Sequence, residues 1–287
     1  MQIIDASAAE SFIKRFDIPP CPAVIGELQA ELGKEDASAT AVARLIGRDV
    51  GLAGAVVSAV NSPVFLSRRK VGSVAEALGM LGFGRIFDLV VSELLKKSIG
   101  GAGSQRLDRY WDSAACTADI CAVLSDHFPG TKRDTAYCFG LFRDCGVPLM
   151  MRRFPAYRES LSSANNESGL ALLAVEEREF GVNHAEIGYL LARTWGLSEI
   201  MVEAIRAHHS YDVLDLKTPA RLPDEANVLI AIGTIAEHVT DLHLRTREEG
   251  QWKAARSRVA AFCSLKDFEL DDLVEDLLLD LEAAEAR

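Results

Sequence analysis

An adjacent arginine and aspartate interrupt an apolar helical segment between residues 137 and 150. The segment reads YCFGLFRDCGVPLM, and the charged pair is Arg143–Asp144. Two charges inside an apolar run cost desolvation free energy unless a partner satisfies them. The pattern leaves three interpretations open: the remains of a catalytic site, a working site of another kind, or a surface pair at a helix edge.

Three of the six histidines fall in one short run of the chain. His184 stands at the start of one predicted helix, and His208 and His209 stand at the end of the next. An antiparallel pair of helices, joined by a turn at 196–198, would bring these side chains to one pocket. The alternative is that they only begin and end their helices, because a protonated histidine is favourable at a helix C-terminus. Few histidines bind anything, which favours the second interpretation.

Motifs for other chemistry are missing. The segment GFGRIF at 82–87 has two glycines, but no strand precedes it and no Walker lysine follows, so a phosphate loop is disfavoured. No G-x-S-x-G nucleophile elbow occurs. The six cysteines never form a C-x-x-C pair, which favours reduced, buried thiols over a disulfide framework or a zinc knuckle.

Helical spacing of apolar residues runs through nearly the whole chain, and no alternating strand pattern appears, so the sequence predicts an all-α fold. Ser38 and Asp49 are predicted N-caps, Ser73 and Glu76 form a predicted capping box, and Gly82 with Gly84 predicts a tight helix junction. The predicted helices lie near 22–34, 38–49, 49–62, 73–81, 84–97, 106–128, 134–153, 168–180, 184–195, 198–209, 224–242, 248–264 and 269–285.

The glycine- and serine-rich segment 98–105 predicts a boundary between two lobes, although it could also be a loop inside one domain. We expect an N-terminal helical lobe at 1–100, a second lobe at 106–245 and a helical extension at 246–287. The last predicted helix carries a dense acidic face and a row of leucines. Those leucines are spaced for packing on the body of the protein, which we favour, or on a second copy in a homodimer.

The bulk composition narrows the class of protein. The 287 residues are 49% hydrophobic and 25% charged, as in globular proteins, and no apolar run approaches the roughly 18 residues that span a bilayer. The N-terminus lacks the pattern of a signal peptide, so we expect a cytoplasmic protein with no membrane association. The net charge of −11 argues against nucleic acid as a partner.

Four stretches, in order over about residues 16–245, resemble the HDOD domain family, a relative of the HD metal-dependent phosphohydrolases. The resemblance implies an all-helical, two-lobed domain whose second lobe is built like the HD phosphohydrolase core. The family is typical of bacterial signalling proteins. The stretches are FDIPPCPAVIGELQAEL, ATAVARLIGRDVGLAGAVVSAVNSPVF, VGSVAEALGMLGFGRIFDLVVS and HAEIGYLLARTWGLSEIMVEAIRAHH.

Catalytic HD proteins hold one or two divalent metals with a first histidine, an adjacent His-Asp pair and a later aspartate. By resemblance, Ser113 replaces the first histidine, Arg143 replaces the histidine of the pair, and Gly233 replaces the later aspartate. We therefore expect a degenerate pocket with no catalytic residue, no metal and no cofactor. Its residues are Ser113, Arg143, Asp144, His184, His208, His209 and Gly233.

The resemblance and the broken ligand set together predict a regulatory, signal-transduction domain that binds an unidentified signalling protein or a small ligand. Two alternatives stay open. Arg143 and the three histidines could form a cationic pocket for a phosphate-containing ligand such as a nucleotide. Less favoured is residual metal-dependent phosphohydrolase activity, for which Asp144 and the histidines are the only support.

Overall fold

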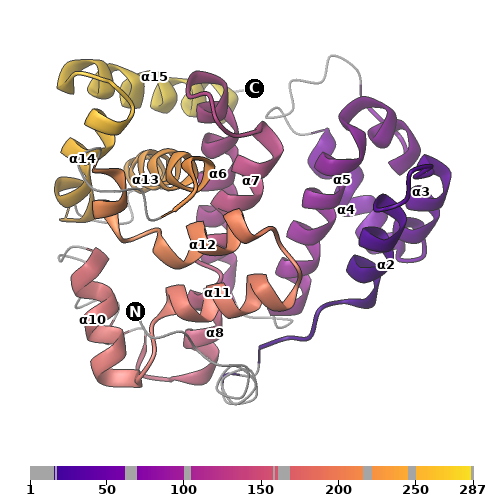
Figure 1. Cartoon of the computed structure of the whole chain (residues 1–287), viewed down its shortest axis with the longest axis horizontal. Coiled ribbons are helices and arrows are strands. Elements are labelled where there is room, and N and C mark those ends of the chain that lie inside the picture. The colour runs from indigo at the N-terminus through magenta and orange to yellow at the C-terminus, as the bar shows by residue number, and fades with distance from the viewer. Residues whose placement is uncertain are drawn as a thin grey trace. The chain divides into compact units, whose positions relative to one another are not determined.

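A computed structural model describes residues 16, 18–61, 70–99, 105–157, 159–160, 169–215, 222–244 and 250–285 (Figure 1). Within these ranges every regular element is a helix, which confirms the all-α prediction. The chain divides into two compact units, Pro20–Ser104 on the one hand and Met1–Pro19 with Gln105–Arg287 on the other. The predicted lobe boundary at 98–105 lies largely outside the described residues. Among the described helices, none has the length and apolar character needed to cross a bilayer.

The smaller unit begins its helices where the sequence predicts them. The Ser38 hydroxyl accepts a hydrogen bond from the backbone N–H of Ala41, and the Asp49 carboxylate accepts one from the N–H of Leu52. Each bond satisfies one of the free N–H groups at a helix start. The helices are α2 (Ala23–Leu32), α3 (Ala39–Gly47), α4 (Val50–Val60) and α5 (Val74–Ile99).

Helix α5 joins the two helices predicted at 73–81 and 84–97. Gly82 lies inside it with φ 78° and ψ 177°, a conformation that glycine adopts at little cost, and kinks the helix there. The predicted junction is therefore confirmed at Gly82, whereas Gly84 does not have a positive φ. At the start of α5 the Ser73 hydroxyl caps Glu76, but the Glu76 carboxylate accepts from the N–H of Gly72 rather than that of Ser73.

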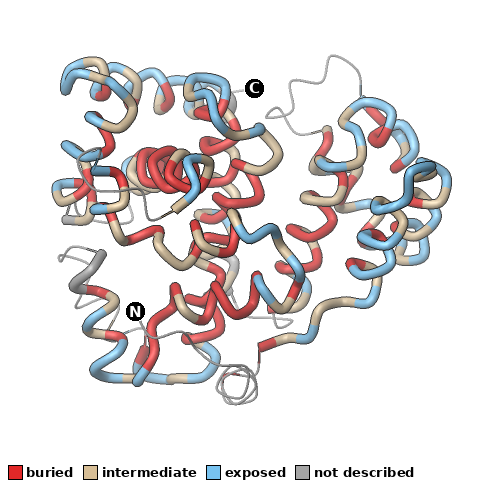
Figure 2. Tube along the Cα trace, viewed as in Figure 1, coloured by how far each residue is buried: buried red, intermediate tan, exposed pale blue. Residues whose placement is uncertain are grey.

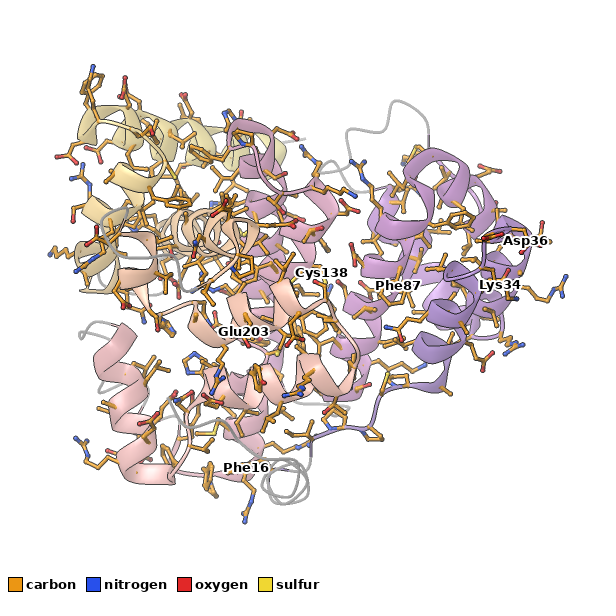
Figure 3. All side chains as sticks on the ribbon, viewed as in Figure 1. Phe16, Lys34, Asp36, Phe87, Cys138 and Glu203 are labelled. Carbon is orange, nitrogen blue, oxygen red and sulfur yellow. The ribbon has the colours of Figure 1, made fainter. Side chains whose placement is uncertain are left out.

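The larger unit is built around α13, which contacts α6, α7, α12, α14 and α15 and is buried along most of its length (Figure 2). Figure 3 places Cys138 of α7 among the packed side chains of this unit, while Lys34 and Asp36 lie at the surface of the smaller unit. The helices are α6 (Gln105–His127), α7 (Arg133–Phe142), α8 (Gly146–Arg153), α10 (Gly169–Phe180), α11 (His184–Thr194), α12 (Glu199–Ala207), η2 (Tyr211–Leu214), α13 (Asp224–Leu244), α14 (Gly250–Phe262) and α15 (Asp267–Glu285).

A fully buried aromatic contact fixes α7 against α11. The rings of Phe142 and Trp195 meet edge to face with centroids 6.3 Å apart, and the indole N–H of Trp195 donates to the Pro19 carbonyl at 3.1 Å. Burying side chains of this size contributes on the order of 1.5–3 kcal/mol each. Phe142 is the last residue of α7 and directly precedes Arg143, and Trp195 follows the end of α11 opposite to His184.

The C-terminal helix α15 packs on the body of the larger unit, against α13 and α14, as the favoured interpretation of its leucines predicts. Its buried residues are Leu270, Val274 and Leu277, whereas Leu279 is exposed. The homodimer stays a prediction. None of the six cysteines, all of which lie in the described part of the chain, forms a disulfide, as their spacing predicts.

Candidate metal centre

Asp144 lies in a three-residue break between α7 and α8, where the sequence predicts one continuous helix over 134–153. That prediction is wrong at residues 143–145. The physical cause is Pro148, which has no N–H to donate to the carbonyl of Asp144 and is favoured in the first turn of a helix. The N–H of Val147 instead donates to that carbonyl at 2.9 Å. The break therefore places Asp144 outside the regular helices, at a corner between α7 and α8.

The three histidines come from the two ends of a helical hairpin, as the antiparallel interpretation predicts. His184 is the first residue of α11, whose start is capped by Asn183 accepting from the N–H of Glu186 at 2.8 Å. Gly196, with φ 70°, closes the turn into α12, and His208 follows the last residue of α12. Because α11 and α12 pack side by side, the start of the first lies near the end of the second.

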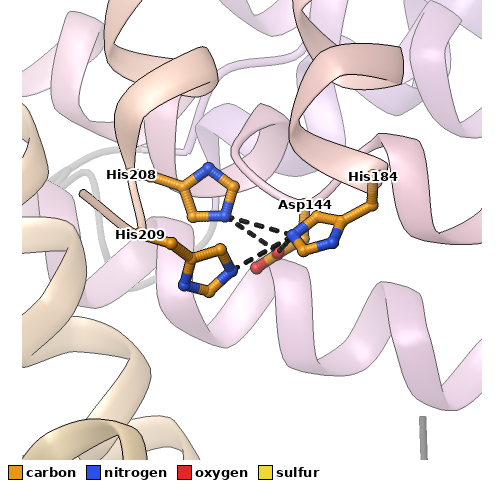
Figure 4. A group of neighbouring side chains, drawn as sticks. All are labelled: Asp144, His184, His208 and His209. Atoms are coloured by element: carbon orange, nitrogen blue, oxygen red, sulfur yellow. Dashed lines mark hydrogen bonds and ion pairs between the residues drawn. The ribbon is translucent and has the colours of Figure 1, made fainter. Parts of the chain in front are cut away.

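Asp144 and the three histidines converge on one point (Figure 4). Nε2 of His184 lies 3.3 Å from Oδ1 of Asp144, 3.4 Å from Nε2 of His208 and 3.2 Å from Nε2 of His209. Nε2 of His208 lies 3.4 Å from the same Asp144 oxygen. All four ligand atoms lie within 4.8 Å of one another. The three histidines are about 1% exposed, whereas the Asp144 side chain is 25% exposed.

These separations fit a tetrahedral metal ion. Ligand atoms that each lie about 2.0–2.1 Å from a tetrahedral Zn²⁺ are about 3.3–3.4 Å apart. Three imidazole nitrogens and one carboxylate oxygen are suited to Zn²⁺ and similar transition ions, whereas Mg²⁺ and Ca²⁺ prefer shells of oxygen ligands. Our sequence-based expectation of no metal rests on three missing ligands. The four that remain nevertheless bring four ligand atoms within 4.8 Å of one another, and four is the number that a tetrahedral ion takes.

The outer nitrogens of two of the histidines have hydrogen-bond acceptors. Nδ1 of His184 lies 2.8 and 2.9 Å from the two carboxylate oxygens of Glu176, and Nδ1 of His208 lies 2.6 Å from the carbonyl oxygen of Ile205. With a proton on Nδ1, the lone pair of each Nε2 is free to face the centre. Nδ1 of His209 is buried and has no hydrogen-bond partner in the described part of the chain.

Burial and neighbouring charges set the protonation of the four groups. Burial opposes the charged form of Asp144, but the Arg143 guanidinium and the hydrogen bond from His184 hold its pKa well below the usual range. Burial alone would lower the pKa of His184, but Glu176 and Asp144 raise it to about 9. Burial lowers the pKa values of His208 and His209. In the metal-free chain at neutral pH, His184 is therefore a cation between the carboxylates of Glu176 and Asp144. A metal ion bound at the centre would supply positive charge at the same position.

Arg143 extends away from the histidines and is only 1% exposed. Its guanidinium donates to the carbonyl oxygen of Gly233 at 2.5 Å and to the carboxylate of Glu237 at 2.7 Å, and its Nε lies 3.4 Å from Oδ2 of Asp144. Arg143 is therefore buried and Asp144 is partly buried, so the two residues are not a surface pair at a helix edge. Asp144 faces the histidines with one oxygen and the guanidinium with the other.

The remaining two sequence-predicted site residues, Ser113 and Gly233, offer no imidazole or carboxylate to the centre. Ser113 lies on α6, partly buried. Gly233 lies on α13, where a side chain would collide with the ring of Phe139, since a Cβ atom would lie 2.5 Å from its Cε1. Gly233 contributes its backbone carbonyl to Arg143 and leaves space for that ring.

Two carboxylates that contact candidate site residues were not predicted from the sequence. Glu237 follows Gly233 by one helical turn on α13, so an acidic group is present near the expected aspartate position but displaced along the helix. Its signal in the sequence is a charged residue within the apolar run LIAIGTIAEHV. Glu176 is one of two adjacent glutamates in AVEEREF, and that pattern does not distinguish the buried glutamate from the exposed one.

Comparison with known proteins shows which family the chain belongs to. The family model of the HDOD domain matches residues 18–211, and the chain belongs to this family. A curated protein of Treponema pallidum, itself uncharacterised, is 26% identical over 196 residues, which are 68% of this chain and 38% of that protein. The chain thus matches well under half the length of that relative.

Solved structures share the fold. An HDOD domain protein of unknown function from Geobacter sulfurreducens superimposes with a TM-score of 0.67 at 22% identity, covering 96% of this chain and 95% of that one. A candidate phosphohydrolase from Shewanella amazonensis gives 0.67 at 21% identity, covering 93% and 92%. A candidate signal transduction protein from Marinobacter aquaeolei gives 0.69 at 20% identity, covering 96% of this chain and 60% of that one. At these identities the likeness concerns the fold.

Proposed function

We propose that this chain is a non-catalytic regulatory domain of signal transduction that acts by binding a partner protein or a small ligand, and whose HD-like lobe holds one divalent transition-metal ion. Asp144, His184, His208 and His209 would hold the ion. The observation that carries the proposal concerns the two carboxylate oxygens of Asp144. Oδ1 faces the three histidines, whereas Oδ2 faces the buried guanidinium of Arg143.

The guanidinium of Arg143 argues against hydrolysis. Two-metal phosphohydrolases use a second ion to share the charge of the attacking and leaving oxygens. Here a permanent cation lies beside Asp144 and is held by Glu237 and Gly233. Arginine keeps its proton near neutral pH, so it repels a second divalent ion and cannot serve as a ligand. A single ion at the histidines would tie the α7–α8 corner to α11 and α12, which is a structural contribution.

Family membership supports the regulatory part of the proposal. A shared fold alone does not carry an activity, so a likeness to candidate phosphohydrolases has little weight beside the replaced ligands. One structural relative is described as a candidate signal transduction protein, which agrees with a regulatory role.

The phosphate-sensing alternative receives less support. A phosphate-binding arginine must present unoccupied donors to the ligand. The Arg143 side chain is 2% exposed, two of its nitrogens donate to Gly233 and Glu237, and its buried Nε lies 3.4 Å from Oδ2 of Asp144. Binding a phosphate there would require breaking a buried ion pair.

The proposal is tested by metal analysis together with a phosphodiesterase assay. The purified chain is stripped with a chelator, reloaded with Zn²⁺ or Co²⁺, and assayed on bis-p-nitrophenyl phosphate with added Mn²⁺. We expect about one bound ion per chain, lost in Asp144→Ala and kept in the exposed control Asp272→Ala, with no turnover above background. Turnover that Asp144→Ala abolishes and Asp272→Ala preserves would overturn the non-catalytic assignment.

The partner-binding part needs a separate measurement. Reciprocal tagging of the chain and of each protein that co-purifies with it should return a pair that binds at one defined stoichiometry. Failure of every co-purifying protein to bind when purified would contradict this part of the proposal.

A further inference from the structure

Glu176 of α10 is a buried carboxylate whose position needs an explanation, because burying an unpaired charge is costly. The residue is 1% exposed. Its Oε2 accepts the backbone N–H of His184 at 2.9 Å, and its Oε1 accepts the hydroxyl of Tyr157 at 2.5 Å. Both oxygens also lie within 2.8–2.9 Å of Nδ1 of His184. The Glu176 carboxylate therefore contacts both the backbone N–H and the imidazole ring of His184.

This arrangement determines which nitrogen of His184 faces the centre as a lone pair. A carboxylate can only accept, so the Nδ1 of His184 must carry a proton that it donates to Glu176. Nε2 can then be unprotonated, and it is the nitrogen that lies near Asp144, His208 and His209. The backbone bond restrains the main chain of His184 at the same time. Histidine ligands in metal proteins commonly donate their other ring N–H to such a carboxylate.

We infer that Glu176 is a positioning residue of the metal centre, and that Tyr157 holds its carboxylate in place. The inference rests on the metal binding proposed above. Helix α10 thereby helps to position a metal ligand, although no residue of α10 is itself a ligand. The adjacent Glu177 and the nearby Glu179 do not share this role, since both are exposed.

The variant Glu176→Gln keeps the shape of the side chain and removes its charge. The amide oxygen can still accept from the backbone N–H of His184, and the amide NH₂ can donate to the hydroxyl of Tyr157. We therefore expect the variant to fold, which circular dichroism checks. The matched control is Glu179→Gln, which makes the same change on the exposed face of the same helix.

The test is a competition titration of the stripped full-length chain with Zn²⁺ against a chromophoric chelator. Glu176→Gln should weaken Zn²⁺ binding about 10- to 100-fold, the range found for outer ligand partners, whereas Glu179→Gln should leave it unchanged. Tyr157→Phe should weaken binding less than Glu176→Gln does. In a His184→Ala background, Glu176→Gln should cause no further loss, because its effect passes through His184. Visible spectra of the Co²⁺-loaded chain report the coordination geometry independently of any activity.

The outcomes separate the two proposals. A wild-type chain that binds no Zn²⁺ or Co²⁺ overturns both the metal centre and the role of Glu176. Equally tight binding of the ion by the wild-type chain and by Glu176→Gln overturns the positioning role alone. The positioning role also fails if Glu179→Gln weakens binding equally, or if Glu176→Gln still weakens binding in the His184→Ala background. Should Glu176→Gln misfold, unchanged affinity in Tyr157→Phe overturns the role of the Tyr157–Glu176 pair.

Discussion

Gly146, the first residue of α8, lies directly against the backbone of His184, the first residue of α11. A Cβ atom at Gly146 would overlap the carbonyl oxygen of His184 and would lie 2.8 Å from its carbonyl carbon and 3.0 Å from the backbone nitrogen of Gly188. This close approach of two helices requires glycine. Because Asp144 precedes Gly146 by two residues, the contact sets the distance between the aspartate and the histidine of the candidate centre.

The variant Gly146→Ala should therefore lower both stability and metal binding. The added methyl group must push α8 from α11, and overpacking of this kind costs about 1–3 kcal/mol of unfolding free energy. Chemical denaturation measures the first effect and Zn²⁺ titration the second. Gly26→Ala is the control, because a Cβ there meets nothing within 4 Å and alanine is favoured in helices by up to about 1 kcal/mol. A Gly146→Ala chain as stable as wild type would contradict the close contact.

Removing the buried Arg143 should destabilise the protein far more than removing a partly exposed arginine whose partner carboxylate is exposed. Arg143→Met leaves the mostly buried Glu237 carboxylate without its guanidinium, and breaking a buried pair costs about 3–5 kcal/mol. The double variant Arg143→Met/Glu237→Gln removes that charge and should recover a large part of the loss. Urea denaturation of both variants measures the difference.

The control for this prediction is Arg256→Met. Arg256 pairs with Asp271, whose side chain is 64% exposed, and exposed pairs contribute only about 0–1 kcal/mol. Equal losses in Arg143→Met and Arg256→Met would show that the buried network around Arg143 does not form.

Local sequence patterns predicted the helical hairpin that carries the three histidines, because the residues that define its helix ends and its turn lie within 30 residues. Asn183 and Ser198 cap α11 and α12, and Gly196 forms the predicted turn between them. The same local reasoning failed at Arg143–Cys145, where the apolar pattern continues through a backbone break. Pro148 is the signal for that break, although its effect appears four residues earlier in the chain.

Partners that are distant in sequence could not be predicted. Arg143 bonds to Glu237, 94 residues away, and the apolar pattern of α13 does not indicate which of its residues face α7. Glu176 and His184 are only eight residues apart, but their contact depends on how α10 and α11 pack. Whether a site has lost its function depends on such contacts, and a comparison of ligand positions alone does not show that Asp144 and the three histidines converge.

Restoring an acidic residue at Gly233 should not restore a second metal site. In Gly233→Asp the Cβ atom meets the ring of Phe139 at 2.5 Å, so we expect a loss of about 1–3 kcal/mol in unfolding free energy. Gly233→Ala makes the same collision without the charge, and the two variants should lose similar stability. Phosphodiesterase activity with Mn²⁺ should stay at background in both. Activity that appears in Gly233→Asp but not in Gly233→Ala would contradict this expectation.

Loading the stripped chain with Zn²⁺ should raise its thermal stability, and the gain should depend on the four converging groups. An ion that binds only the folded state stabilises it by about 2.7 kcal/mol at a hundredfold excess over Kd, because its ligands converge only after folding. His209→Ala removes one ligand from a buried position and should remove most of that gain. His127→Ala, at the exposed end of α6, removes a histidine without touching the cluster and should preserve the gain in full. Differential scanning calorimetry with and without Zn²⁺ gives both values, and a gain that is equal in His209→Ala and His127→Ala would mean that the ion binds elsewhere on the chain.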